Sequence, residues 1–122
     1  MAYRSWTVTC QPASRARRPT VAATAPLGAD VLERLAEHHE IAYLLTRPDR
    51  PRGRGRQVGA PPAKETSQRL RIPVRQPERL DESFSLGPAD TVVVAAYGAL
   101  IPDSLLDRAS WLNAHPSLLP RW

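Results

Sequence analysis

The sequence predicts an α/β fold built around a mostly parallel sheet, and three observations support this. Apolar segments of strand length occur at residues 20–23, 41–46 and 91–96. Between the first two, Leu27, Val31 and Leu35 recur every fourth position, which places them on one face of a helix. The third segment, TVVVAA, lacks polar alternation, as expected of a strand covered on both faces of a parallel sheet. The order strand, helix, strand at the start is that of a βαβ unit.

The first helix is predicted over residues 26–40, with Pro26 acceptable in its first turn. The second strand ends before Pro48, and residues 47–62 form a loop rich in proline, glycine and arginine. Directly after this loop we expect a helix over 63–71 with Leu70 facing the core, an extended segment over 72–76 and a weakly helical stretch over 79–87. After the strand at 91–96 we expect a turn at 97–98, a helix around 104–108 and a strand over 111–115 ended by Pro116.

The length and composition describe one ordinary domain. The 122 residues are 42% hydrophobic and 24% charged, and no apolar run approaches the length needed to cross a bilayer. We therefore expect no membrane partner. The single cysteine, Cys10, excludes an internal disulfide and a cysteine-based metal site, which favours a reducing, intracellular environment. His38 and His39 are adjacent on the first helix and do not share a face, so no metal site is expected there.

The net charge of +5 is concentrated in two segments. Residues 1–19 contain four arginines and no acid, and residues 47–56 contain five arginines and one aspartate, which leaves −3 for the remainder. Codon bias in a GC-rich genome accounts for the preference for arginine over lysine, but not for this clustering. Basic patches of this kind can pair with phosphates. Residues 1–19 are expected to be irregular or disordered, and a mitochondrial transit peptide is a less favoured interpretation.

Asn113 and His115 are the first candidates for chemistry. Two positions apart on an extended chain, their side chains lie on one face, at the carboxyl end of a predicted strand where open parallel sheets bind ligands. Histidine can move a proton near neutral pH, and the asparagine amide can hold an oxyanion, so the pair suits acyl transfer. An isolated Asn-x-His pair is nevertheless more often structural.

Two further segments could bind ligands. The tail from His115 to Trp122 brackets a Ser-Leu-Leu turn with two prolines, and either presents backbone amides to a ligand or is a simple connector. The loop from Arg47 to Arg56 alternates arginine and glycine near its end. It suits phosphate contact rather than base reading, because no aromatic residue is interleaved. A solvated basic linker is the alternative.

These segments together resemble the methionyl-tRNA formyltransferase family. WLNAHPSLLPRW resembles the signature of enzymes that use 10-formyltetrahydrofolate. RPDRPRGRGRQVGAPPAK is similar to the loop that distinguishes this family from glycinamide ribonucleotide formyltransferases. TVVVAAYGALIP resembles the strand and loop that line the folate pocket. IPVRQPERL resembles the family's segment between the arginine-rich loop and that strand. The matches occur in the family's order and cover residues 20–122.

The resemblance implies a Rossmann-like formyltransferase domain over residues 20–122, with a mostly parallel sheet that is incomplete at its C-terminal end. Its implied activity is transfer of a formyl group from 10-formyltetrahydrofolate to the methionine amino group of initiator methionyl-tRNA in a bacterial-type cytoplasm, with no metal. Asn113 and His115 would polarise the formyl carbonyl and assist proton transfer. The implied binding residues are, for the formyl-folate, Tyr97, Gly98, Ala99, Leu100, Ser117, Leu118, Leu119 and Pro120, and for the tRNA, Arg50, Arg52, Arg54 and Arg56.

The sequence departs from the family's pattern in three places. Residues 23–28 read ATAPLG where the family has a Gly-Thr turn followed by Phe-Ala, and residues 81–88 are shorter than the family's helix. The family's catalytic aspartate and its carboxy-terminal tRNA-binding domain would lie beyond Trp122, so the chain is expected to be a fragment with weak activity. Two other functions stay open: a 10-formyltetrahydrofolate-dependent transferase acting on a small amine, and a non-catalytic folate- or RNA-binding remnant.

Overall fold

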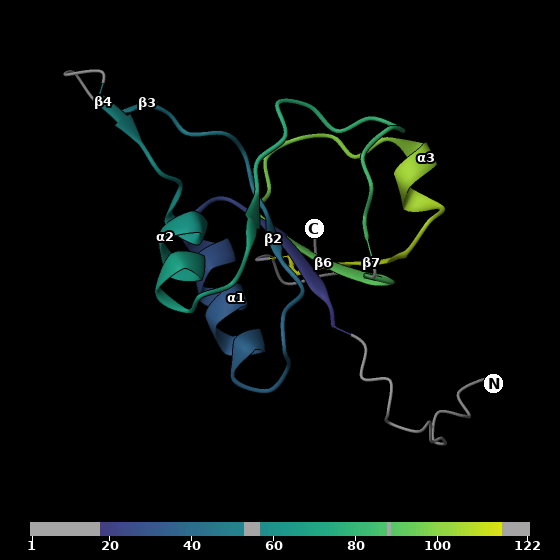
Figure 1. Cartoon of the computed structure of the whole chain (residues 1–122), viewed down its shortest axis with the longest axis horizontal. Coiled ribbons are helices and arrows are strands. Elements are labelled where there is room, and N and C mark those ends of the chain that lie inside the picture. Colours follow the sequence, from purple (N-terminus) through teal and green to yellow (C-terminus); the bar gives the residue numbers. More distant parts are fainter. Residues whose placement is uncertain (1–17, 53–56, 88, 116–122) are drawn as a thin grey trace, which may run out of the picture.

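Five parallel strands form the centre of the molecule, in the order β5–β2–β1–β6–β7. The computed structural model describes residues 18–52, 57–87 and 89–115, and Figure 1 shows how these elements are arranged. The strands of this sheet are β1 (Thr20–Ala23), β2 (Leu44–Leu45), β5 (Val74–Arg75), β6 (Thr91–Ala95) and β7 (Ser110–Asn113). The helices are α1 (Pro26–Ala36), α2 (Pro62–Arg69) and α3 (Asp103–Leu106). The predicted α/β class with a mostly parallel sheet is therefore confirmed.

The two central strands, β1 and β6, consist of small and β-branched residues. In β6 only Val92 and Ala95 are fully buried, so the coverage of both faces predicted for this strand is incomplete. All four residues of β1 are buried, and β1 pairs with β6 from Thr20↔Val92 to Ala23↔Ala95. The short strand β2 makes backbone hydrogen bonds to its neighbours beyond both of its ends. The Ala42 amide donates to the Pro19 carbonyl at 2.8 Å, and the Thr46 amide donates to the Arg75 carbonyl at 3.0 Å. The sheet therefore extends beyond the regular part of β2 on both sides.

The first helix ends four residues earlier than predicted. The amides of Glu37 and His38 donate to carbonyls only three positions back, at 3.2 and 3.1 Å, so the last turn tightens and the chain leaves the helix axis. This lets the chain return beside β1 and enter β2. In α2 the buried residues are Ala63 and Ser67, and Leu70, predicted to face the core, is only half-buried after the helix end.

The segment predicted as a loop over residues 47–62 contains a second, antiparallel pair of strands. These are β3 (Arg50–Arg52) and β4 (Gln57–Gly59), with Pro51 opposite Val58. A two-stranded ribbon leaves outward amide positions unpaired, and a proline can occupy one of them. Figure 1 shows the β3–β4 hairpin standing out from the body of the molecule beyond α2.

Residues 79–87 form turns rather than the weak helix that was expected. The Asp81 carboxylate accepts hydrogen bonds from the Ser83 amide at 2.9 Å and from the Ser83 hydroxyl, a pattern that competes with helix formation. The segment instead sends Phe84 and Leu86 toward the sheet. Strand β7 ends at Asn113, so His115 lies outside the regular strand that was predicted to contain it.

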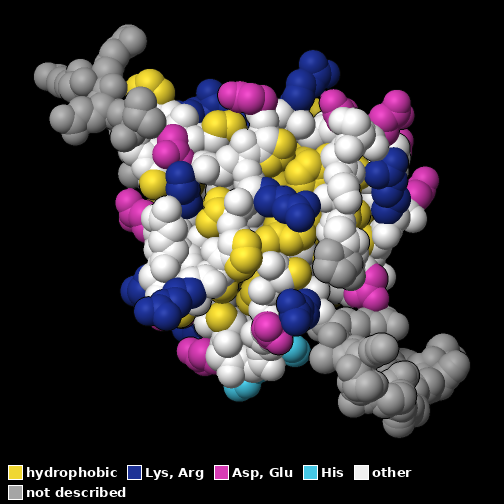
Figure 2. Space-filling model, in the orientation of Figure 1, with side chains coloured by type: hydrophobic (Ala, Val, Ile, Leu, Met, Phe, Trp, Pro, Cys, Tyr) yellow, Lys and Arg dark blue, Asp and Glu magenta, His cyan; other side chains and the backbone are white. Residues whose placement is uncertain are grey.

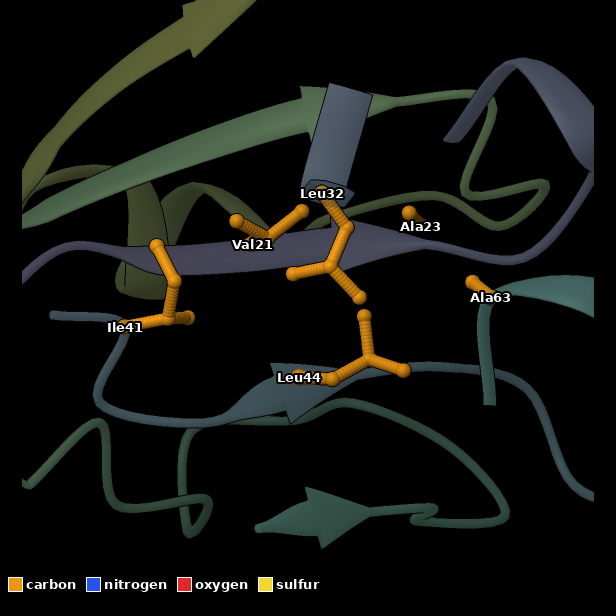
Figure 3. Packing of buried hydrophobic residues seen from close by; sticks show 6 residues of the cluster. All are labelled: Val21, Ala23, Leu32, Ile41, Leu44 and Ala63. Atoms are coloured by element: carbon orange, nitrogen blue, oxygen red, sulfur yellow. The ribbon is translucent and has the colours of Figure 1, made fainter. Parts of the chain in front are cut away.

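Two hydrophobic clusters cover the two faces of the sheet. The first lies between the sheet and helices α1 and α2, where Leu32 meets Val21 and Leu44 (Figure 3). The second lies on the other face, where Tyr43, Leu45 and Val92 pack against the 80–86 segment. The Tyr43 hydroxyl donates to the Leu86 carbonyl at 3.1 Å, which fastens the segment to the sheet.

Residues 1–17, to which most of the predicted irregular N-terminal extension belongs, lie outside the described residues. In the described part of the chain, no helix is both long and apolar enough to span a membrane. Figure 2 shows hydrophobic side chains in the middle of one face, with acidic and basic side chains interspersed around them.

Candidate active site

The strand order creates a switch point between β1 and β6. From β1 the chain adds β2 and β5 on one side of the sheet and then adds β6 and β7 on the other. In open α/β sheets, ligands bind outside the carboxyl ends of the strands at such a point. The residues that follow these ends are Thr24 after β1, Thr46 after β2, Gln76 after β5, Ala96 after β6 and Ala114 after β7.

Thr24 connects three strand ends. Its hydroxyl donates to the Tyr97 carbonyl at 2.7 Å and lies 3.3 Å from the Thr46 hydroxyl. The Arg47 amide lies 3.4 Å from the same oxygen. The Thr24 carbonyl in turn accepts the Ala63 amide at 3.2 Å, which places the start of α2 at this edge. Thr24 therefore holds the edge together from the middle of the sheet.

The chain leaves β6 in an unusual backbone conformation. Ala96 has a φ of 53° and Gly98 a φ of 87°. The first is costly for an L-residue with a side chain, and such strain gathers at functional sites. The turned Ala96 carbonyl accepts the amides of Thr24 and Ala25, at 3.1 and 3.3 Å, just before α1 begins. The turn after β6 is thus joined directly to the start of the first helix.

The segment predicted to line the folate pocket divides into a buried and an exposed part. Tyr97 is buried in the second cluster, and burial raises the pKa of its phenol. Because its side chain is buried, Tyr97 contributes only its backbone to this edge of the sheet. Gly98 and Ala99 are exposed, and Leu100 is 92% exposed. Arg47 holds this segment, because its Nη1 donates to the Gly98 carbonyl at 2.6 Å.

Asn113 and His115 lie at the same edge, both exposed. Asn113 pairs in register with Val94, and the Ala114 amide still donates to the Val94 carbonyl at 2.8 Å. The chain therefore follows β6 as far as Ala114, and the two candidate residues flank this bonded position. Side chains alternate along an extended chain, so this arrangement is compatible with a shared face for Asn113 and His115.

Sequence reasoning missed a polar cluster at the end of β5. The Asp49 carboxylate accepts hydrogen bonds from Gln76 Nε2 at 2.7 Å and from Lys64 Nζ at 3.1 and 3.2 Å. The bond from Gln76, and then those from Lys64, hold the pKa of the Asp49 carboxyl below its ordinary value. A search for polar residues at or directly after the end of each predicted strand would have found Gln76 and Thr24.

Several predicted site residues are only partly described or not described. Arg50 is exposed on β3. The Arg52 side chain, Arg54 and Arg56 lie outside the described part of the chain, as do Ser117, Leu118, Leu119 and Pro120. Within residues 18–52, 57–87 and 89–115, no three histidine, cysteine or acidic side chains are grouped so that they could hold a metal ion.

The Thr24 contacts predict a measurable loss of stability. Thr24→Val keeps the side-chain shape but leaves the Tyr97 carbonyl without its hydroxyl donor. We expect the free energy of unfolding, measured by urea titration, to fall by about 1–2 kcal/mol. Ser110→Ala, at an exposed position on β7, is the control and should change it by less than about 0.5 kcal/mol. Equal stability of both variants would contradict a structural role for the Thr24 hydroxyl.

Comparison with known proteins bears directly on this edge. A family model described as formyl transferase matches residues 20–122. Over 107 residues, the chain is 44% identical to a methionyl-tRNA formyltransferase of Dichelobacter nodosus, covering 83% of this chain and 34% of that protein. Over 113 residues, it is 43% identical to a methionyl-tRNA formyltransferase of Thiobacillus denitrificans, covering 86% of this chain and 37% of that protein.

A third relative, a methionyl-tRNA formyltransferase of Neisseria gonorrhoeae, is 46% identical over 91 residues, covering 68% of this chain and 30% of that protein. The chain thus spans about a third of the length of these curated relatives. The matched region contains all five parallel strands and both candidate residues at the end of β7.

Proposed function

The chain belongs to the formyl transferase family, and from this premise we propose that it carries the donor site and catalytic edge of a methionyl-tRNA formyltransferase. The family implies a folate-type formyl donor, which we identify as 10-formyltetrahydrofolate. The acceptor is the methionine amino group of initiator methionyl-tRNA, as the names of the relatives suggest. Because these relatives are bacterial proteins, we place the activity in a bacterial cytoplasm.

The observation that carries the proposal is the position of Asn113 and His115 on either side of Ala114, beside the turn that follows β6. In the reaction, the amino group attacks the formyl carbon and a tetrahedral intermediate forms. The Asn113 amide donates to the developing oxyanion, and the His115 imidazole assists transfer of the amine proton toward the leaving folate nitrogen. The bond from the formyl carbon to that nitrogen then breaks, which gives formyl-methionyl-tRNA and tetrahydrofolate.

The exposed loop after β6 supports the assignment of the donor side. Gly98, Ala99 and Leu100 follow the switch point, and an exposed leucine there offers an apolar surface to a flat ring. Gly98 is held by Arg47, so the loop is already anchored before a ligand arrives. Ser117, Leu118, Leu119 and Pro120 would contact the same donor.

The direct experiment supplies the chain with 10-formyltetrahydrofolate and initiator tRNA charged with methionine. The expected result is formyl-methionyl-tRNA, detected by mass spectrometry of the released amino acid, above the level formed without protein. Isothermal titration should also show binding of the donor. Absence of both donor binding and product would refute the proposal.

The arginine-rich hairpin provides the test of the acceptor. Replacing Arg50, Arg52, Arg54 and Arg56 together by alanine should weaken binding of initiator tRNA at least about tenfold and flatten its salt dependence, because phosphate contacts are lost. The matched control replaces four arginines of the other basic segment, Arg4, Arg15, Arg17 and Arg18, and changes the net charge equally. An equal loss in both variants would indicate unspecific attraction.

The two alternative functions give different results in these assays. A transferase acting on a small amine would keep its activity, and would bind tRNA no more weakly, when the hairpin arginines are replaced. A non-catalytic remnant would bind folate or RNA with an affinity insensitive to Asn113→Ala and His115→Ala, and would form no product.

A further inference from the structure

An ion pair joins the two sides of the β3–β4 hairpin at its base. Asp49 directly precedes β3, and Lys64 lies near the start of α2, which follows β4. The two residues are fifteen positions apart in the sequence. Lys64 Nζ lies 3.1 Å from one Asp49 carboxylate oxygen and 3.2 Å from the other. The side chains are only 33% exposed for Asp49 and 19% for Lys64, so solvent screens this pair less than a fully exposed one.

A third side chain fastens this pair to the sheet. Gln76, directly after β5, donates from Nε2 to Asp49 Oδ1 at 2.7 Å and to the Arg47 carbonyl at 3.0 Å. A carboxamide nitrogen carries two hydrogens, so both bonds can form at once. The base of the hairpin is thus held by α2 on one side and by an edge strand of the sheet on the other.

The same short segment also reaches the loop after β6. The Arg47 guanidinium donates to the Gly98 carbonyl, two residues before the exposed Leu100. Residues 47–49 therefore contact both the proposed donor loop and the root of the hairpin. The position of the first arginine of the hairpin, Arg50, depends on the backbone of Asp49 immediately before it.

We propose that Asp49 is a positioning residue that fixes the β3–β4 hairpin, with Arg50, relative to the catalytic edge so that bound RNA is presented to the formyl donor. The expected effect of Asp49 on RNA binding rests on the proposed function, in which tRNA is the acceptor. The structural part of the proposal, the anchoring of the hairpin, is independent of that acceptor. Asp49 does not touch the reacting atoms and acts through Lys64, Gln76 and the hairpin backbone.

The sign of the effect separates positioning from simple electrostatics. Asp49→Asn removes a negative charge beside the arginines, so charge alone predicts tighter tRNA binding. Positioning predicts the opposite, a loss of about threefold to tenfold, because the hairpin must be ordered when RNA binds. Glu33→Gln is the matched control, because it also removes one negative charge and so changes the net charge equally. It breaks the exposed pair between Glu33 and Arg69, at 3.2 Å, away from the hairpin.

Amide hydrogen exchange of the unliganded full chain tests the anchoring directly. Asp49→Asn should raise the exchange rates of the β3 and β4 amides at least about tenfold, while those of β1 and β6 stay unchanged. Glu33→Gln should leave the hairpin rates as they are. The charge-swapped double variant Asp49→Lys/Lys64→Asp should restore slow exchange in part, because the ion pair is re-formed while the hydrogen bond from Gln76 Nε2 to residue 49 is lost.

Unchanged hairpin exchange in Asp49→Asn, or a rise that is equal throughout the sheet, would overturn the proposal. Tighter tRNA binding by Asp49→Asn would overturn its functional half. If the unsubstituted chain bound no tRNA, the assignment of tRNA as acceptor would be refuted. The proposed effect of Asp49 on tRNA binding would then be refuted with it. The exchange rates would still decide whether Asp49 anchors the hairpin.

Discussion

Replacing His115 by alanine is expected to slow formyl transfer by about a hundredfold or more, the usual loss when a general acid–base group is removed. Asn113→Ala should cost about a hundredfold as well, because one donor to the oxyanion is lost. Both residues are exposed at the end of β7, so the variants should fold normally. The rates are compared under single-turnover conditions with the protein in excess over charged initiator tRNA.

His39→Ala is the matched control for this experiment. His39 is also an exposed histidine, but it follows α1, whereas the candidate edge lies at the carboxyl ends of the strands. Its replacement should leave the transfer rate within about twofold of the unsubstituted chain. Binding of 10-formyltetrahydrofolate should persist in all three variants, since the loop at residues 98–100 is unaltered. An unchanged rate in both Asn113→Ala and His115→Ala would exclude them from the chemistry.

Gly28→Ala is expected to lower the free energy of unfolding by about 2 kcal/mol, the typical effect of overpacking a core. A Cβ at this position of α1 would lie 2.4 Å from the Ala23 Cβ and 2.5 Å from the Ala95 carbonyl oxygen. The Ala95 oxygen is backbone, so relief requires the helix to move away from the sheet. Helix propensity alone predicts the opposite sign, a gain of about 1 kcal/mol for alanine over glycine.

Urea unfolding followed by circular dichroism measures this difference. Asp30→Ala, at an exposed position of the same helix, is the control and should change stability by less than about 0.5 kcal/mol. A Gly28→Ala variant as stable as the unsubstituted chain would show that α1 can shift without cost. Because Ala23 and Ala95 directly precede Thr24 and Ala96, we also expect this variant to bind the formyl donor more weakly.

Much of the fold could be predicted because burial leaves a local pattern. The uninterrupted apolar run at β6 and the four-residue spacing in α1 each reflect what one segment buries, and both elements were found near their observed bounds. The wrong predictions fall where contacts outside the segment decide. Residues 79–87 turn because they pack on the far face of the sheet, and residues 47–62 contain two strands that pair with each other rather than with the main sheet.

The sequence by itself determined that a parallel sheet forms, and that Asn113 and His115 stand at a strand end. Periodicity and proline placement within a few residues are sufficient for both. Only the tertiary structure decided that β6 lies beside β1, that Thr24 contacts Tyr97 from 73 positions away, and that Lys64 and Gln76 meet at Asp49. These contacts between distant residues depend on how the strands pair across the whole sheet. The residue pattern within one strand does not indicate which other strand lies beside it.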